Sequence, residues 1–204
     1  MDTAIQIGRP WNKGLIVGQK RPLLPRQVWS IRVRLEMSAS ARDLALFNLA
    51  IDSKLRASDL VQLRVEDICS GTLVRDRGIV TQRKTGRPIQ FEITEVTRQS
   101  IERLLASRPS DGGYLFRSRT QGRSHLSARQ YARSVQRWIS NIGLDDRGFG
   151  THSLRRTKVA QIDRKTGNLR AVQLLLGHAK IETTVRYLGV ELDDALRLAE
   201  QVEL

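Results

Sequence analysis

The spacing of apolar residues changes twice along this chain, and this change limits the fold more than any other feature of the sequence. Before residue 70, apolar residues recur at helical spacing, as in "RDLALFNLAID". The segment that follows is β-branched and interrupted by glycines, and Ile89, Phe91 and Ile93 alternate there with polar residues. Helical spacing then returns and continues toward the C-terminus. The pattern predicts a mostly α-helical fold with a small antiparallel β-sheet, an α+β protein.

Capping and turn residues indicate where these elements begin and end. Pro25 suits the first turn of a helix, and Ser58 is suited to cap a helix that carries Leu60 and Leu63. The segment "KTGRP" has the composition of a turn, which places Lys84 in a β-hairpin. Further helices are expected at 95–107, at 127–142 with Ser127 as the cap, and at 152–164, 168–176, 181–188 and 191–203.

The charge composition points to a polyanionic partner. The 204 residues include 35 Lys and Arg against 21 Asp and Glu, a net charge of +14. Like charges repel one another in a folded chain, so such a surplus is understandable when DNA phosphates balance it. An acidic membrane is the weaker alternative, because the chain has no long apolar window and no signal sequence. We therefore expect a nucleic acid as the partner, with no membrane.

Cysteine and histidine are scarce. The single Cys69 excludes an internal disulfide and suggests a reducing, cytoplasmic compartment. Three histidines and one cysteine make a zinc site of ordinary ligand spacing improbable. We expect neither a metal nor another cofactor.

Six polar residues fit poorly with a purely structural role when they are considered together. Each has an ordinary explanation on its own, such as a surface arginine, a turn lysine, a capping histidine or a half-buried tyrosine. Their joint order along the chain favours a functional site. The six are Arg56, Lys84, His152, Arg155, His178 and Tyr187.

These residue types could carry out phosphoryl transfer without a metal ion. Two arginines can hold the non-bridging oxygens of a phosphodiester, because a guanidinium stays charged at any working pH. A tyrosine has an ordinary pKa of about 10, so it needs a base such as histidine before it attacks. A lysine can give a proton to the departing oxygen. His152 and Arg155 are three residues apart and so share one helix face.

The sequence around these residues resembles the tyrosine recombinase family, the phage-integrase type of site-specific DNA recombinase. Arg56 lies in "KLRASDLVQLRVEDI", similar to the family pattern G-L-R-x-S-E-L-x-x-L-x-x-x-D-I, and Lys84 lies in "RKTGRP". "THSLRRT" matches the H-x-x-R pair, His178 matches the histidine of L-G-H, and Tyr187 in "TTVRYLGV" matches the nucleophile. The resemblance runs over about residues 26–200 and fills all six positions.

The resemblance implies a domain organisation and an assembly. It implies a tyrosine recombinase catalytic domain over 26–204. Residues 1–25 carry several Gly, Pro, Lys and Arg and little periodicity, so we expect a basic N-terminal arm there, either a flexible tail or a DNA contact. The helix at 191–203 would pack on its own domain or on a neighbour. The usual N-terminal core-binding domain would be missing, and Lys54 stands where the family commonly has glycine. The implied partners are double-stranded DNA, three further copies in a homotetramer, and accessory DNA-bending proteins.

The resemblance also implies a role for each residue in cutting and rejoining DNA through a 3′-phosphotyrosine intermediate. The nucleophile is Tyr187, the phosphate clamp is Arg56 and Arg155, the base is His152, the acid is Lys84, and a further phosphate donor is His178.

Three alternative functions remain open at this point. A non-cutting DNA-binding regulator with the same fold would have no need of the intact tyrosine and arginines. A type IB-like topoisomerase would use the same chemistry but would relax supercoils without exchanging partners. A metal-dependent nuclease is disfavoured because the sequence offers no clustered carboxylates.

Overall fold

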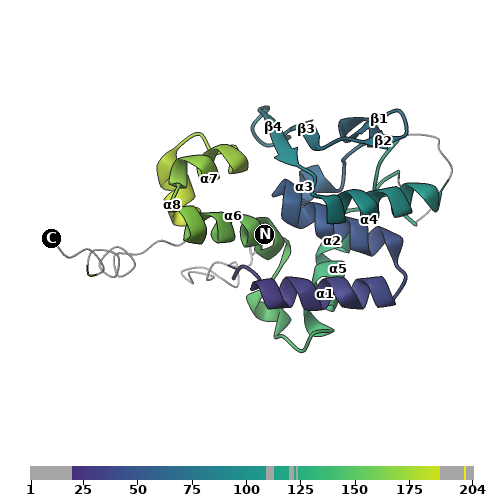
Figure 1. Cartoon of the computed structure of the whole chain (residues 1–204), viewed down its shortest axis with the longest axis horizontal. Helices are drawn as coiled ribbons and strands as arrows, with labels where there is room; N and C mark the ends of the chain where they lie inside the picture. Colours follow the sequence, from purple (N-terminus) through teal and green to yellow (C-terminus); the bar gives the residue numbers. More distant parts are fainter. Residues whose placement is uncertain (1–19, 109–112, 120–121, 123, 189–199, 201–204) are drawn as a thin grey trace, which may run out of the picture.

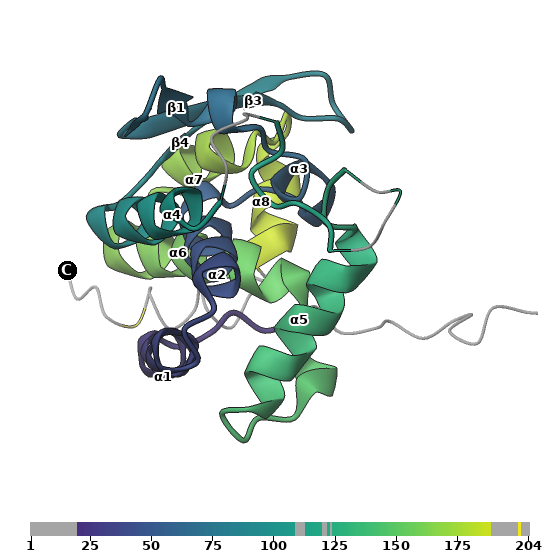
Figure 2. The ribbon, with the colours of Figure 1, turned by 90° about the vertical axis from the view of Figure 1, so that its right-hand side faces the viewer.

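One helix, α2 (Ala41–Ser53), lies at the centre of the protein. It packs against α1 (Pro25–Met37), α4 (Glu95–Ala106) and α6 (Thr151–Thr166), which surround it in Figure 2. Each α2 residue from Asp43 to Ser53 is buried. This is why the helix is apolar on more than one face, whereas a surface helix carries a single apolar stripe.

The structure is a computed structural model, and it describes residues 20–108, 113–119, 122, 124–188 and 200. Most of the arm expected at 1–25 and the helix expected at 191–203 lie outside the described residues. The remaining elements, drawn in Figure 1, are α3 (Ala57–Leu60), the 3₁₀ helix η1 (Val65–Asp67), β1 (Cys69–Ser70), β2 (Leu73–Val74), β3 (Arg77–Thr81), β4 (Pro88–Glu92), α5 (Ala128–Ser140), the 3₁₀ helix η2 (Asp146–Gly148), α7 (Leu169–Leu176) and α8 (Ile181–Leu188).

The β segment forms two small antiparallel sheets, where the sequence predicted one. β1 pairs with β2, and β3 pairs with β4 in the expected hairpin. Ile89 and Phe91 of β4 are buried, as their alternation predicted. Gly78 of β3 lies opposite Phe91, and a Cβ there would sit 2.4 Å from the Phe91 ring. The glycine is therefore required by close packing inside the hairpin.

Several predicted boundaries are confirmed. Pro25 occupies the first turn of α1. Ser127 caps α5 and accepts a hydrogen bond from the Gln130 backbone N–H at 3.1 Å, completing a capping box. The mostly helical α+β class is confirmed as well.

The prediction for the helix after Arg56 was wrong. Ser58 lies inside α3 and does not cap it, because Arg56 is the N-cap residue and the helix has only four residues. Leu63 is not helical, since its carbonyl accepts a hydrogen bond from the Leu115 N–H at 2.7 Å. A contact with a distant segment thus ends the helix before its apolar pattern does.

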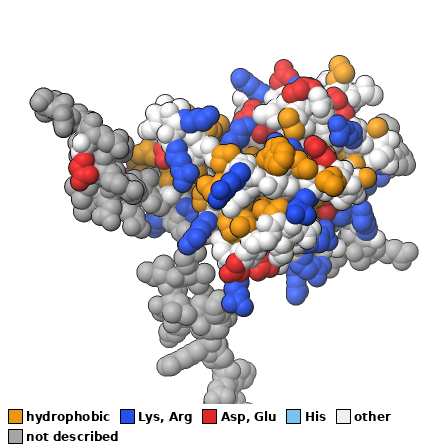
Figure 3. All heavy atoms as spheres, turned by 60° about the horizontal axis from the view of Figure 1, so that its bottom comes forward, with side chains coloured by type: hydrophobic (Ala, Val, Ile, Leu, Met, Phe, Trp, Pro, Cys, Tyr) orange, Lys and Arg blue, Asp and Glu red, His pale blue; other side chains and the backbone are white. Residues whose placement is uncertain are grey.

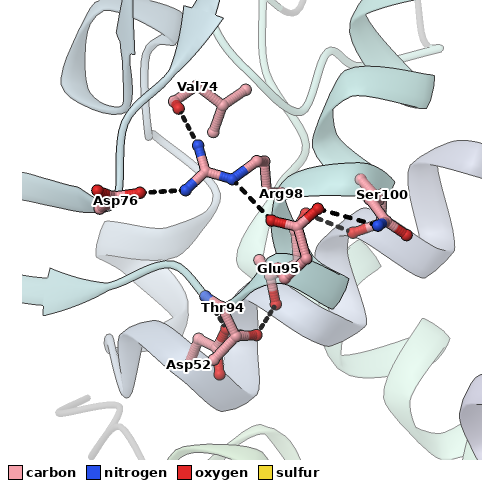
Figure 4. A network of polar contacts seen from close by, with 9 residues as sticks. Asp52, Val74, Asp76, Thr94, Glu95, Arg98 and Ser100 are labelled. Carbon is pink, nitrogen blue, oxygen red and sulfur yellow. Dashed lines mark hydrogen bonds and ion pairs between the residues drawn. The ribbon is translucent and has the colours of Figure 1, made fainter.

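The start of α4 is fastened to α2 and to the sheets (Figure 4). The Thr94 backbone N–H and hydroxyl both donate to Asp52 Oδ2, at 2.9 and 2.6 Å. Arg98 donates to the Val74 carbonyl and to Asp76, and its Nε donates to Glu95 at 3.1 Å. These contacts fix the sheets relative to the central helix.

A charge cluster joins the end of α2, the end of β4 and the middle of α6. Lys54 has a left-handed backbone (φ 54°, ψ 22°) and a fully buried side chain. Its Nζ lies 2.8 and 2.6 Å from the two carboxylate oxygens of Glu92. Lys158 Nζ lies 2.7 Å from both Asp52 and Glu92. Burial lowers the pKa of Lys54, whereas the negative charge of Glu92 raises it. The cluster therefore pairs two cations with two anions.

Two apolar cores of unequal size result. The large one contains α2 and its neighbours. The small one consists of Val159, Val172 and Leu176, with Ile162, Tyr187 and Leu188 packed against it. Helices α7 and α8 therefore rest on α6 through a core of their own.

A groove of about 470 Å³ lies between α1, the start of α2 and α5. Its floor includes Leu35 and Trp138, and its arginines are Arg34, Arg42, Arg119, Arg133 and Arg137. The face that brings α1 forward shows Lys and Arg side chains beside apolar ones (Figure 3). None of the described helices combines the length and the apolar character needed to cross a membrane.

Candidate active site

Three of the six predicted residues meet between α6, α7 and α8. The guanidinium carbon of Arg155 lies 5.7 Å from the centre of the Tyr187 ring. The His178 ring lies 5.5 Å from the same ring, centre to centre, at 80°. Arg155 of α6 and His178 of the loop between α7 and α8 are thus brought to the ring of Tyr187 on α8.

Arg56 joins this group through a buried glutamine. Arg56 Nη1 donates to Gln82 Oε1 at 2.8 Å, and Gln82 Nε2 donates to the Leu176 carbonyl at 3.4 Å. Arg155 Nη2 donates to that same carbonyl at 3.1 Å. The two arginines are therefore held by one connected set of hydrogen bonds at the end of α7.

The sequence reasoning did not single out Gln82. Its side chain is fully buried and accepts a second hydrogen bond, from the Thr85 hydroxyl at 2.8 Å. The only signal in the sequence was its place two residues before Lys84. A buried amide at the base of a polar turn needs partners, but the sequence does not say which ones.

Gly177 explains why α7 ends just before His178. It has φ 65° in the left-handed C-cap conformation, and a Cβ there would lie 3.2 Å from Gln82 Nε2. The chain turns at this glycine, and His178 Nδ1 then lies 3.1 Å from the Thr184 hydroxyl. The end of α7 at Gly177 therefore places the His178 imidazole between α7 and α8.

Lys84 and His152 lie at the edge of the group. Lys84 is exposed in the turn between β3 and β4, and no hydrogen bond or ion pair joins it to another described residue. His152 is exposed in the first turn of α6. Among the described residues, the structure does not place Lys84 in contact with the tyrosine.

Both histidines near the arginines favour the neutral form. Burial lowers the pKa of His178 to about 4, helped by the charges of Arg155 and Arg56. Partial desolvation of the His152 imidazole by its neighbours, together with the charges of Arg155, Arg156 and Arg56, also lowers the pKa of His152. Each imidazole is therefore in its neutral form at neutral pH.

The tyrosine hydroxyl is buried and protonated at neutral pH. Burial raises the pKa of Tyr187 to about 12, although Arg155, Arg156 and Arg56 act in the opposite direction. Among the described residues, neither the Tyr187 hydroxyl nor the buried Nε of Arg155 has a hydrogen-bond partner. Two adjacent donors thus lack an acceptor, which is uncommon for buried polar atoms.

Arg156 is a second residue that the sequence reasoning missed. Its side chain is buried, its guanidinium carbon lies 5.0 Å from the centre of the Tyr187 ring, and Nη2 donates to the Tyr187 backbone carbonyl. The only signal was its position directly after Arg155.

Comparison with known proteins identifies the family. Residues 23–192 match the model of the phage integrase family. The chain belongs to the phage integrase family. This confirms the resemblance seen in the sequence.

Phage integrase family relatives match most of the chain. It is 30% identical over 166 residues to the "Probable integrase/recombinase YoeC" of Bacillus subtilis, which covers 81% of this chain and 87% of that protein. It is 31% identical to a "Tyrosine recombinase XerC" of Neisseria gonorrhoeae, over 79% of this chain and 52% of the relative. The chain thus spans about half the length of this XerC.

The fold of a solved phage integrase relative agrees with that of this chain. The XerH site-specific recombinase bound to its difH substrate superposes with a TM-score of 0.70 at 19% identity. The match covers 89% of this chain and 55% of the XerH chain. The prediction of a tyrosine-recombinase-like catalytic domain fold is confirmed.

Proposed function

We propose that this phage integrase family member is a site-specific DNA recombinase that cuts and rejoins DNA through a covalent bond to Tyr187. One observation carries the proposal: no described residue offers an acceptor to the buried Tyr187 hydroxyl or to the neighbouring Arg155 Nε. A phosphodiester offers such acceptors in its non-bridging oxygens. A phosphate bound here would accept a hydrogen bond from Arg155 Nε and would lie beside the Tyr187 hydroxyl.

The proposed step is a transesterification. The Tyr187 oxygen attacks phosphorus, the bond from phosphorus to the 5′ oxygen breaks, and a 3′-phosphotyrosine forms. The tyrosine proton passes to His152, and the leaving oxygen takes a proton from Lys84. The reverse step rejoins a strand, and the phosphotyrosine bond conserves the energy needed for it.

The remaining residues stabilise the charge on the phosphate. Arg56 and Arg155 hold the non-bridging oxygens, and loss of one such donor costs about 10²–10³ in rate by analogy with oxyanion-hole deletions. His178 gives a further hydrogen bond to the phosphate. The lowered pKa of His152 keeps its imidazole in the neutral form, which is the form that can accept a proton. Lys84 stands on an exposed turn, where a bound duplex can reach it.

The proposed assembly follows the same reasoning. The proposed substrate is double-stranded DNA, and the net charge of +14 supports it. Strand exchange between two sites needs four active sites, so we propose a homotetramer on DNA, associated with the nucleoid. We also propose accessory DNA-bending proteins as partners.

Covalent trapping tests the proposal. Supercoiled DNA carrying the protein's own genomic locus is incubated with protein in EDTA, stopped with SDS, and examined for protein-bound DNA. The variants are Tyr187→Phe and, as the matched control, Tyr114→Phe, a half-buried tyrosine that stacks on His125. Wild type and Tyr114→Phe should form the adduct, and Tyr187→Phe should not.

The other outcomes separate the alternatives. Salt-sensitive DNA binding without any adduct would indicate a non-cutting regulator. An adduct with supercoil relaxation but no exchange between two sites would indicate a topoisomerase. An adduct that survives in Tyr187→Phe would contradict the assignment of the nucleophile.

A further inference from the structure

Two adjacent arginines of α6 lie beside the Tyr187 ring, and their hydrogen-bond donors are directed to different partners. Arg155 uses one nitrogen to bind the Leu176 carbonyl and has a buried Nε that no described residue satisfies. Arg156 directs its donors to backbone carbonyls, those of Tyr187 and Lys20. The first arginine is thus able to bind a phosphate, whereas the second binds the protein itself.

The contact with Lys20 connects the tyrosine to the beginning of the described chain. Arg156 Nη1 donates to the Lys20 carbonyl at 3.0 Å. Residues 20–24, which we call the N-terminal strap, lie across the start of α6. The Arg21 N–H donates to the Gly148 carbonyl at 3.1 Å, and the Leu23 N–H donates to the Thr157 hydroxyl at 3.0 Å.

The strap is firmly seated at one end. Leu23 is only 1% exposed and belongs to the large core. Thr157, next to Arg156, holds the Leu23 N–H and also donates to the Ser153 carbonyl at 2.7 Å. Adjacent residues of α6 therefore bind the strap, and one of them also binds the helix of the tyrosine.

The helix of the tyrosine needs such a contact. Helix α8 has eight residues, and its partly buried Tyr187 and Leu188 pack against the small core rather than the large one. A helix this short is marginal without tertiary contacts. The stacked guanidinium and its hydrogen bond to the Tyr187 carbonyl hold the end of α8 against α6.

We propose that Arg156 is a positioning residue that couples the N-terminal strap to the nucleophile. With the strap seated, Arg156 keeps the Tyr187 ring beside Arg155, and when the strap is displaced that hold weakens. Loss of the contacts between the strap and α6 therefore slows cleavage while the residues that hold the phosphate stay unchanged. This inference rests on the proposed function of Tyr187.

The test separates DNA binding from cleavage in the full chain. Variants Arg156→Gln, Arg156→Lys, Thr157→Val and the double variant Arg156→Gln/Thr157→Val are compared for the Kd of DNA binding and for the single-turnover rate of adduct formation. Assays run well below each variant's unfolding temperature. The control is Thr166→Val, which removes the hydroxyl of another α6 threonine that also donates to the carbonyl four residues back, at 2.8 Å.

The expected result is a loss of rate at unchanged Kd. Arg156→Gln should slow adduct formation about 10²-fold, the scale of a misplaced reacting group. Arg156→Lys should recover part of the rate, and Thr157→Val should slow it although it leaves Tyr187 and Arg156 intact. The double variant should be no slower than Arg156→Gln, because both changes break one linkage.

Three results would overturn the inference. One is Arg156→Gln as fast as wild type, and another is a double variant in which the two losses multiply. If Arg156→Gln does not fold, Thr157→Val decides alone, and a rate equal to that of Thr166→Val overturns the coupling. A wild type that forms no adduct at Tyr187 overturns instead the proposed function on which the inference rests.

Discussion

At the scale of single residues, four buried side-chain atoms have no hydrogen-bond partner among the described residues, and two of them, the Tyr187 hydroxyl and Arg155 Nε, belong to this site; the others are Asn48 Nδ2 and Asp59 Oδ2. A buried polar group without a partner costs about 1–3 kcal/mol of stability. Proteins keep such a cost mainly where function requires it. Binding of a phosphate would remove it, so substrate and fold stabilise each other here.

Gln82→Met should lower cleavage and leave DNA binding intact. The change removes the acceptor of Arg56 and the donor to the Leu176 carbonyl while keeping similar volume. Arg56 then loses its fixed orientation, and the rate of adduct formation should fall by up to about 10²-fold. Gln90→Met, on the exposed side of β4, is the matched control. Equal rates in the two variants would show that Gln82 does not orient Arg56.

Acid should destabilise the protein partly through His178. Its pKa is lowered from 6.5 to about 4 in the folded state by burial, Arg155 and Arg56. Between these values the unfolded chain binds more protons, so stability is lost as the pH falls from about 6.5 to about 4. Denaturant unfolding of His178→Asn should show a weaker dependence over this range.

Lys180→Gln, on a nearby exposed side chain, is the control for the pH experiment. His152 has its pKa lowered too and adds a slope of the same sign, so some dependence persists in His178→Asn. A slope unchanged from wild type would contradict the assignment to His178.

At the scale of elements, the left-handed backbone of Lys54 at the end of α2 leads to a prediction about stability. Lys54→Gly and Lys54→Ala both remove the buried ammonium that pairs with Glu92, and both should unfold more easily than wild type. Because the residue is left-handed at φ 54°, glycine avoids a strain of about 1 kcal/mol that alanine retains. Chemical denaturation should therefore rank Lys54→Gly above Lys54→Ala.

Ala39 provides the control for this ranking. It has φ 51° in an exposed turn, so Ala39→Gly changes the backbone strain without removing a buried charge. The free energy of unfolding of Ala39→Gly should exceed that of wild type by about as much as the value for Lys54→Gly exceeds the value for Lys54→Ala. Equal stability of Lys54→Gly and Lys54→Ala would show that side-chain loss, and not backbone strain, dominates at this position.

The elements also show what a sequence can and cannot predict. Local periodicity was sufficient for α2, α5 and the β3–β4 hairpin, because apolar spacing and turn residues determine them directly. It was insufficient for α3, which ends where Leu63 pairs with Leu115, a residue 52 positions later. Such a contact leaves no mark on the local pattern.

The same division holds within the site. The order of motifs was sufficient to predict that Arg56, Arg155, His178 and Tyr187 belong together. Gln82 and Arg156 remained hidden because their roles depend on backbone carbonyls of α7, α8 and the strap, and a carbonyl has no sequence signature.

At the scale of the whole molecule, the net charge of +14 predicts salt-sensitive DNA binding. The logarithm of the binding constant should fall linearly with the logarithm of salt, by about 0.9 per phosphate contact. Arg133 is exposed in the groove between α1 and α5, and no ion pair joins it to another described residue. Arg133→Gln should therefore reduce the slope by about 0.9.

Arg103→Gln on the exposed side of α4 serves as the control. It changes the net charge equally but lies outside the groove. Two variants with the same slope would show that overall charge, and not the groove, accounts for the salt dependence.

The burial of Lys54 has a practical consequence for proteolysis. Trypsin cuts after lysine and arginine, and the chain has 35 of them. The bond between Lys54 and Leu55 is shielded, since these residues are 0% and 3% exposed at the end of the central helix. Cleavage there requires the large core to open, so a tryptic fragment ending at Lys54 reports global unfolding. Mass spectrometry of a timed digest could follow that fragment and measure the opening of the core without any label.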